Sequence, residues 1–125
     1  MKGIKHLFVG EKGEDISADY IKKQGFHIIE RNYRKPWGEI DIIAQKDGCI
    51  HFVEVKTVSD VTRESGYEAE EKVDKKKRKR LRRIIETYLL KNKWEDREFQ
   101  IDVLVIHLDP DGGLVKTNFL KDIVL

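Results

Sequence analysis

The chain has 125 residues, which is enough for one domain, covering residues 1–125, with a core that needs no disulfide or structural metal. Charged residues make up 38% of the sequence but the formal net charge is only +2, so the overall balance excludes neither acidic nor basic partners. The single cysteine, Cys49, excludes an internal disulfide and indicates a reducing, cytoplasmic compartment. No apolar run is long enough for a signal peptide or a membrane span, so no membrane association is expected.

The first expected element is a helix from about residue 11 to residue 24. Ile16, Tyr20 and Ile21 share one helical face, and Gly25 supplies a C-terminal stop. Residues 26–34 then have the composition of a strand that ends at the sequence Pro-Trp-Gly.

Two further strands, 39–45 and 49–57, are expected to pair as a hairpin. The intervening Lys-Asp-Gly is typical of a tight turn, because glycine tolerates the positive φ that such turns need. Alternation along the first of these strands predicts Asp41 and Ile43 on one face and Ile40 and Ile42 on the other.

The second half of the chain is expected to contain a loop at 58–72, a helix at 73–91 and strands at 99–109 and 114–117. The helix has apolar residues at the spacing of an amphipathic helix, from Leu81 to Leu89. The order of helix, three strands, helix and two strands predicts an α/β domain with a mixed central β-sheet and helices packed on it.

The stretch HFVEVK, at 51–56, has two charges within an apolar strand. Alternation sends Glu54 and Lys56 to the same side as Ile50 and Phe52, toward the core. Buried charges cost several kcal/mol when unpaired and seldom stabilise a fold when paired, so stability alone does not explain them. The pattern indicates a site of chemistry, with an ion pair on an edge strand as the alternative.

Asp41 lies on the strand next to Glu54, and both carboxylates can point to one face. Two carboxylates are what Mg²⁺ or Mn²⁺ needs from a site that cleaves phosphodiesters, because the remaining ligands are water and phosphate. Lys56 could then orient the attacking water or neutralise the developing charge.

The motifs GEIDIIA and FVEVK, with GEDISADYI upstream, resemble the YraN family of uncharacterised proteins. That family belongs to the PD-(D/E)xK, or restriction-endonuclease-like, nuclease superfamily. More distantly, the order of acids resembles archaeal Holliday-junction resolvases. The resemblance implies a restriction-endonuclease-like sheet, a metal held by Asp41, Glu54 and the Val55 carbonyl, Glu14 reaching in from the first helix, and Lys56 as the catalytic lysine. For Glu14 the alternative is an acidic residue favoured by the helix macrodipole.

A basic run follows an acidic stretch in the middle of the chain. Beside a phosphodiesterase site it indicates binding to the nucleic-acid backbone, although such a run is also typical of a solvated helix face. Its basic residues are Lys75, Lys76, Lys77, Arg78, Lys79, Arg80, Arg82 and Arg83. Lys77 alone falls on the apolar stripe, so it either runs its stem along the core edge or presents its ammonium to the site.

Together these features predict a Mg²⁺- or Mn²⁺-dependent endonuclease that cuts DNA, with structured or branched DNA as the expected substrate. The alternative is a non-catalytic module that keeps the nuclease fold and binds nucleic acid or a protein. Trp37 and Tyr33, beside basic residues, could stack on bases or pack within the turn. A homodimer would let such an enzyme cut two strands, but no sequence patch identifies its interface.

Overall fold

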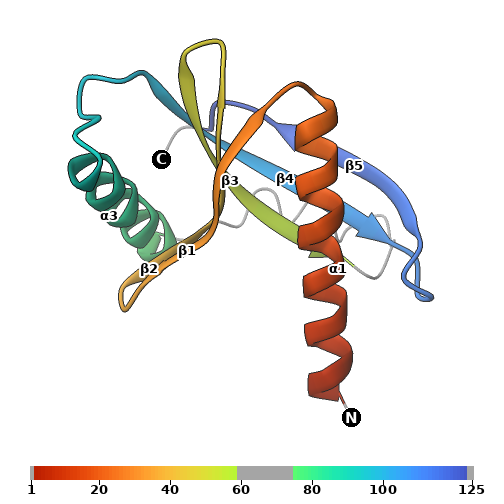
Figure 1. The fold of residues 1–125 in the computed structure, drawn as a ribbon. Helices are drawn as coiled ribbons and strands as arrows, with labels where there is room; N and C mark the ends of the chain where they lie inside the picture. The colour runs from red at the N-terminus through yellow and green to blue at the C-terminus, as the bar shows by residue number, and fades with distance from the viewer. Residues whose placement is uncertain (1, 59–74, 124–125) are drawn as a thin grey trace.

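The computed structural model describes residues 2–58 and 75–123, with side chains from residues 13 and 76 onward in the two ranges. The elements are α1 (Lys2–Lys23), β1 (His27–Lys35), β2 (Gly38–Lys46), β3 (Cys49–Val58), α3 (Lys75–Lys91), β4 (Phe99–Leu108) and β5 (Leu114–Leu120). Figure 1 shows the sheet between the two helices. In the described ranges, neither helix is long and apolar enough to cross a membrane.

The five strands form one mixed sheet in the order β1-β2-β3-β4-β5. Among the described strands, only β3 and β4 pair in parallel, because α3 returns the chain between them, and the other pairs are antiparallel. The predicted α/β class and element order are confirmed, and the arrangement is compatible with a restriction-endonuclease-like fold. The predicted loop lies outside the described residues except for Val58, which ends β3.

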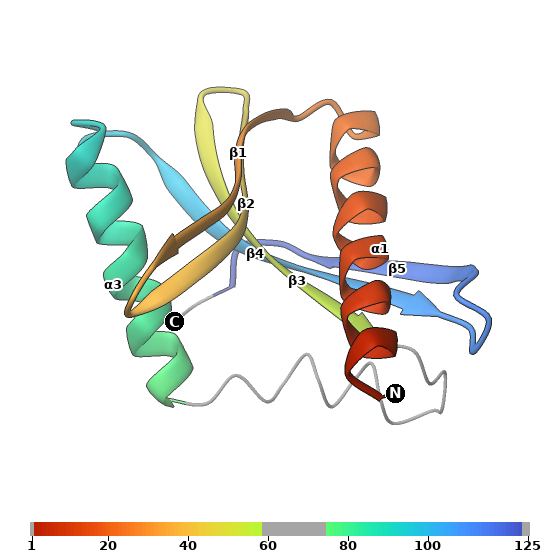
Figure 2. The same cartoon turned by 60° about the horizontal axis from the view of Figure 1, so that its bottom comes forward.

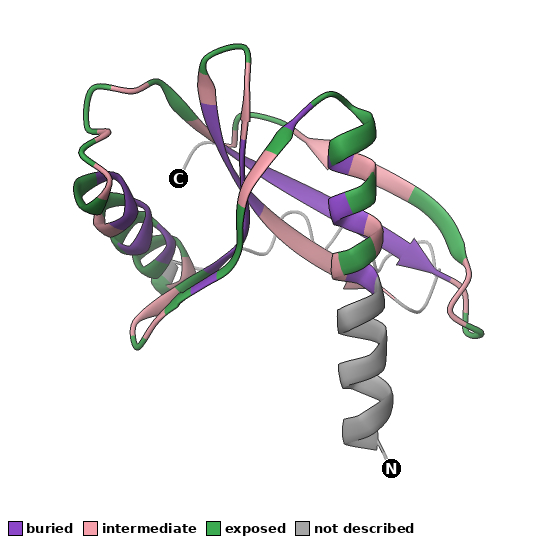
Figure 3. Ribbon diagram, viewed as in Figure 1, coloured by how far each residue is buried: buried purple, intermediate pink, exposed green. Residues whose placement is uncertain are grey.

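Each face of the sheet packs against one helix, as the second view shows (Figure 2). On the α3 side, Ile50 and Phe52 of β3 are buried against Ile84, Ile85 and Tyr88. The opposite face packs against α1 through a second cluster, whose members are Ala18, Ile21, Phe26, Ile42, Ala44, Val53, Leu104, Ile106 and Leu108. Figure 3 shows these buried residues running through the middle strands and the inner faces of the helices.

Alternation along β3 decides which helix each side chain meets. Ile50 and Phe52 face α3, whereas Val53 faces α1. Glu54 and Lys56 have the same parity as Phe52, so they continue the α3 face toward the end of the strand. Glu54 and Lys56 therefore point to the same face as Ile50 and Phe52, as predicted.

Two details of the sequence prediction are wrong. The first helix begins at Lys2 rather than near residue 11, because the apolar stripe used for the prediction covers only its C-terminal part. Ile40 packs in the same cluster as Ile43, not on the opposite face. β2 pairs with β3 only from Ile42 onward, and the preceding part of β2, residues 38–41, continues with β1 as a two-stranded arm that reaches α3. Because this arm is free of β3 and reaches α3, Ile40 packs in the cluster beneath that helix.

Candidate active site

Asp41 lies where β2 separates from β3. The first β2 residue paired with β3 is Ile42, opposite Val53. Two residues further along β3, the backbone N–H of Val55 donates to Asp41 Oδ2 at 2.7 Å. The carboxylate thus accepts the hydrogen bond that a β2 carbonyl would accept if the strands stayed paired. This bond fixes a buried acid, only 8% exposed, at the opening between the strands.

The Val55 carbonyl faces the same opening. In an extended strand, the N–H and C=O of one residue point to the same side, and consecutive residues alternate. The Ile50 N–H donates toward β4, to the Glu98 carbonyl, so even-numbered residues of β3 face β4. Val55 therefore directs both of its backbone groups toward β2, where its N–H meets Asp41.

The surroundings of Asp41 oppose its ionisation. Burial, followed by the negative charge of Glu54, raises the pKa of Asp41 to about 7, and Glu39 and Glu14 add smaller effects in the same direction. The hydrogen bond from Val55 lowers the pKa but does not offset burial. A nearby cation would strongly stabilise the ionised form of a carboxyl group in these surroundings.

Glu54 lies beside Asp41 and is paired with a lysine from α3. Its side chain is 13% exposed, and its Oε1 lies 3.5 Å from Lys77 Nζ. Burial raises the pKa of Glu54, whereas the charges of Lys77 and Lys56 lower it. The structure therefore presents the Lys77 ammonium to the site, which was one of the two alternatives that its position on the helix left open.

Lys56 completes this group on the α3 face of β3. Burial, and then the positive charge of Lys77, lower the pKa of Lys56, while Glu54 raises it. Two acids and two lysines are thus close enough to influence one another's ionisation. An ammonium beside paired carboxylates is suited to neutralise charge that develops on a substrate oxygen.

Glu14 approaches from α1 because the helix comes unusually close to the end of β3. A Cβ atom at Gly13 would overlap the Thr57 side chain, so only glycine permits this approach. Ser17, fully buried, donates from Oγ to the Gly13 carbonyl at 2.7 Å. Glu14 is half-buried and near enough to Asp41 for its charge to raise the pKa of that residue.

The basic run forms the first turns of α3. Lys77 is half-buried and turned toward Glu54, and the side chain of Lys75 lies outside the described part of the chain. The other members of the run are exposed, namely Lys76, Arg78, Lys79, Arg80, Arg82 and Arg83. The helix therefore carries a positive surface directly beside the acidic pair.

The two aromatic residues near the β1–β2 turn pack within the protein. Tyr33 is buried, with its ring 5.1 Å from that of Tyr88 in an edge-to-face contact. Trp37 packs against the cluster under α3, and the guanidinium of Arg83 lies 4.4 Å from its ring centroid. Their packing role therefore prevails over base stacking, since the arginine occupies one face of Trp37.

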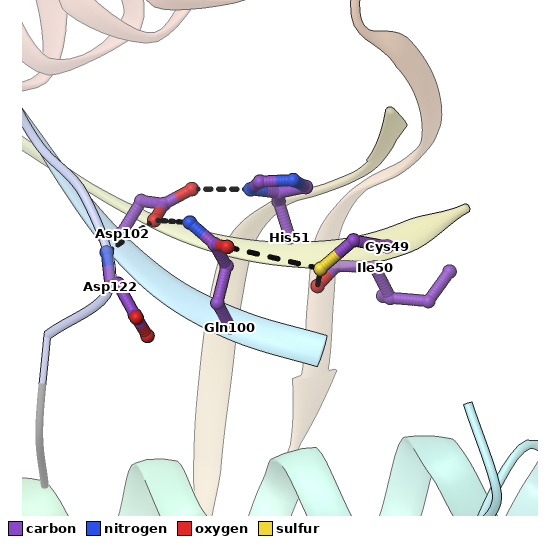
Figure 4. A network of polar contacts seen from close by, with 6 residues as sticks. All are labelled: Cys49, Ile50, His51, Gln100, Asp102 and Asp122. Carbon is purple, nitrogen blue, oxygen red and sulfur yellow. Dashed lines mark hydrogen bonds and ion pairs between the residues drawn. The ribbon is translucent and has the colours of Figure 1, made fainter. Parts of the chain in front are cut away.

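A second polar group lies on the α1 face of the sheet (Figure 4). His51 Nδ1 and Asp102 Oδ2 are 2.7 Å apart, and Asp102 Oδ1 accepts from Gln100 Nε2 and from the Asp122 N–H, each at 2.9 Å. The Phe26 ring packs edge-to-face against the His51 ring, with the ring centroids 4.7 Å apart. Both carboxylate oxygens of the buried Asp102 therefore have hydrogen-bond partners, and the network connects the segment after β5 to the sheet. Sequence reasoning missed it, although an aspartate inside the apolar run of β4 was a signal that a partner was needed.

Most of the possible metal ligands near Asp41 are oxygen atoms, which suits a hard divalent cation. Among the described residues, no three or more His, Cys, Asp or Glu side chains are arranged to hold a metal ion. A metal bound by Asp41 and Glu54 would therefore need the Val55 carbonyl, water or substrate oxygens as further ligands. Mg²⁺ in proteins commonly keeps several waters and binds few carboxylates, so this sparse donor set fits it.

Comparison with known proteins identifies the family of the chain. The model of "Uncharacterised protein family UPF0102" matches residues 13–106, a range that includes Glu14, Asp41, Glu54 and Lys56. A UPF0102 protein of Campylobacter jejuni is 43% identical over 107 residues, covering 86% of this chain and 90% of the relative. A UPF0102 protein of Dictyoglomus thermophilum is 38% identical over 112 residues, covering 90% and 92%. The chain belongs to the UPF0102 family, the YraN family that its motifs resemble.

Proposed function

We propose that this protein is a Mg²⁺- or Mn²⁺-dependent nuclease that hydrolyses phosphodiester bonds in DNA. The observation that carries the proposal is the position of Asp41. Its buried carboxylate is fixed by the Val55 N–H at 2.7 Å and faces the charge of the neighbouring Glu54. Burying two acids together destabilises a fold, and a catalytic cation is a physical reason for keeping them there.

Asp41, Glu54 and the Val55 carbonyl would hold the metal ion. A bound divalent ion would stabilise negative charge on the phosphate and lower the pKa of a coordinated water. Glu14 adds a third acid on the α1 side, near enough to act electrostatically on Asp41. Its position favours a role in orienting water around the ion.

Lys56 and Lys77 would act on the substrate from the α3 side. Lys77 lies against Glu54, so it can move from the carboxylate to an incoming phosphate oxygen. Lys56 would place its ammonium where charge develops as the phosphodiester is attacked. The pKa of Lys56 is lowered by burial, which brings proton transfer closer to neutral pH.

The exposed basic residues of α3 would bind the phosphate backbone. Their contacts are sequence-independent and sensitive to salt, which suits an enzyme that recognises the structure of DNA rather than its sequence. We therefore propose structured or branched DNA as the substrate, with a homodimer as the form that cuts both strands. The single thiol, Cys49, supports a cytoplasmic location.

Cleavage of single-stranded, duplex and branched DNA, and of RNA, would test the proposal in the presence of Mg²⁺, Mn²⁺ or EDTA. We expect metal-dependent products from the wild type, and a loss of rate of about 100-fold or more in Glu54→Gln and Lys56→Met. Glu98→Gln and Lys116→Met are matched controls, because both residues are exposed and lie away from the acidic pair. Equal rates in Glu54→Gln and the wild type would remove these acids from the mechanism. Salt-sensitive binding without any product would instead support a non-catalytic nucleic-acid-binding module.

A further inference from the structure

An open notch of about 270 Å³ lies between the β1–β2 turn and α3. It is separate from the acidic pair, which does not line it. The residues around it that bear on its chemistry are Arg34, Lys35, Trp37, Gly38, Glu39 and Arg80.

Close packing holds the two walls of the notch together. The backbone of Gly38 lies so near α3 that a Cβ atom there would be 3.4 Å from the Arg80 carbonyl oxygen. On the same turn, Trp37 packs on the core beneath α3 and against the Arg83 guanidinium. The turn is therefore docked on the helix, and the basic side chains of both walls are held close to one another.

The charge of the notch is positive. Arg34, Lys35 and Arg80 contribute three cations, and the one acid, Glu39, accepts a hydrogen bond from Arg34 Nε at 3.0 Å. Arginine side chains match the geometry of a phosphate, which can accept two parallel hydrogen bonds from one guanidinium. The open, shallow shape and this charge suit a phosphate group attached to a longer chain.

Two features connect the notch to the acidic pair. Glu39, on its rim, is close enough to Asp41 and Glu54 for its charge to raise the pKa of both. On α3, Lys77 contacts Glu54 and Arg80 lines the notch. Residues three apart share a helix face, and a rise of about 1.5 Å per residue separates these two by about 4.5 Å along the axis. The notch and the acidic pair therefore lie within about one turn of each other along α3.

We propose that the notch binds a backbone phosphate of the DNA strand being cut, close to the scissile phosphate. Arg80 and Lys35 contact this phosphate. Glu39 keeps Arg34 oriented, and Trp37 positions the turn on α3 without stacking on a base. The proposal rests on the proposed nuclease function for the identity of the ligand, and it makes the turn and the helix a single phosphate-binding unit.

Binding of fluorescent single-stranded and duplex DNA in EDTA, measured against salt concentration, tests this unit without turnover. Arg80→Gln and Lys35→Met should each weaken binding by about 5- to 20-fold and reduce the slope of log Kd against log salt by about one. Lys116→Met, an exposed cation on β5, should leave both quantities unchanged. Unchanged affinity and slope in both notch variants would overturn the proposal, as would a wild type that binds neither DNA.

A scan of neutral methylphosphonate linkages along the strand locates the bound phosphate. In the wild type, one linkage near the cut should weaken binding, and Arg80→Gln should abolish the loss at that linkage alone. A loss that persists in Arg80→Gln would contradict the proposed contact. Cleavage assays separate the two proposals. Notch variants that cleave with wild-type KM would contradict the notch proposal and support the nuclease proposal. Position-specific binding without any cleavage would support phosphate binding at the notch and contradict the nuclease proposal.

Discussion

Replacing Asp41 with asparagine should stabilise the metal-free protein at alkaline pH. The pKa of Asp41 is raised, by burial first and by Glu54 next, to about 7 from an ordinary value of 3.8. Between these values the folded protein holds a proton that the unfolded chain releases, so stability falls as the pH rises through this window. Asparagine carries no charge to bury, and its side-chain carbonyl can still accept the hydrogen bond from Val55.

The size of the effect follows from the pKa difference. Each pKa unit corresponds to about 1.4 kcal/mol, so a carboxyl group that ionises near pH 7 instead of 3.8 costs at most about 4 kcal/mol once fully ionised. The cost is absent below the unfolded pKa and complete above the folded one. The variant should therefore gain stability over the wild type steadily between pH 4 and pH 8.

Urea denaturation in EDTA at several pH values measures this difference. Asp19→Asn is the matched control, because Asp19 is exposed on α1 and its change should give a difference that is nearly independent of pH. A stability difference between Asp41→Asn and the wild type that does not grow with pH would refute the reasoning. So would a variant less stable than the wild type at pH 8.

Three further predictions concern the supports of the site. Gly13→Ala should destabilise the protein by about 1–3 kcal/mol despite the higher helix propensity of alanine, because the added methyl overlaps Thr57. Adding Thr57→Ala should recover part of the loss, and additive effects in the double variant would show that the two residues do not interact. Asp102→Ala should lower the free energy of unfolding by about 3 kcal/mol, since the buried His51 and two part-buried donors lose their acceptor, and cleavage per folded molecule should be unchanged. A small change in urea midpoint would contradict this. Lys77→Met should raise the pKa of Lys56, because the charge of Lys77 lowers it, so the alkaline limb of the pH profile of kcat should move to higher pH. An unmoved or lowered limb would exclude Lys56 as the group that titrates there.

The order of elements was predictable because short-range patterns carry it. The apolar residues of α3 repeat with helical spacing, and the Lys-Asp-Gly turn joins β2 to β3. Lys77 was placed on the apolar stripe by the helical repeat alone, and it contacts Glu54. Each of these signals depends only on neighbouring residues.

Features that depend on distant residues were not predictable in the same way. No local pattern shows that β2 is separated from β3 before Ile42, and this separation is what opens the Val55 N–H to Asp41. The orientation of Ile40 follows from the same separation. The notch likewise arises only when the β1–β2 turn docks on Arg80, which lies far along the chain.

The acidic pair was predicted from the cost of inward charges. Alternation placed Glu54 on the face of Phe52, and the structure places Asp41 near it. The pairing of Asp102 with His51 was missed, although the same cost argument applies to a buried aspartate in β4. One buried acid is satisfied by its partners, whereas the other faces further acids, and only the fold distinguishes them.

Calorimetric titration with Mn²⁺ at pH 8, where Asp41 is mostly ionised in the folded protein, tests most directly whether the acids bind a metal. The wild type and Glu98→Gln should take up the ion with the same affinity, and Glu54→Gln should lose it. Failure of the wild type to bind Mn²⁺, or undiminished uptake by Glu54→Gln, would contradict a metal site at Asp41 and Glu54.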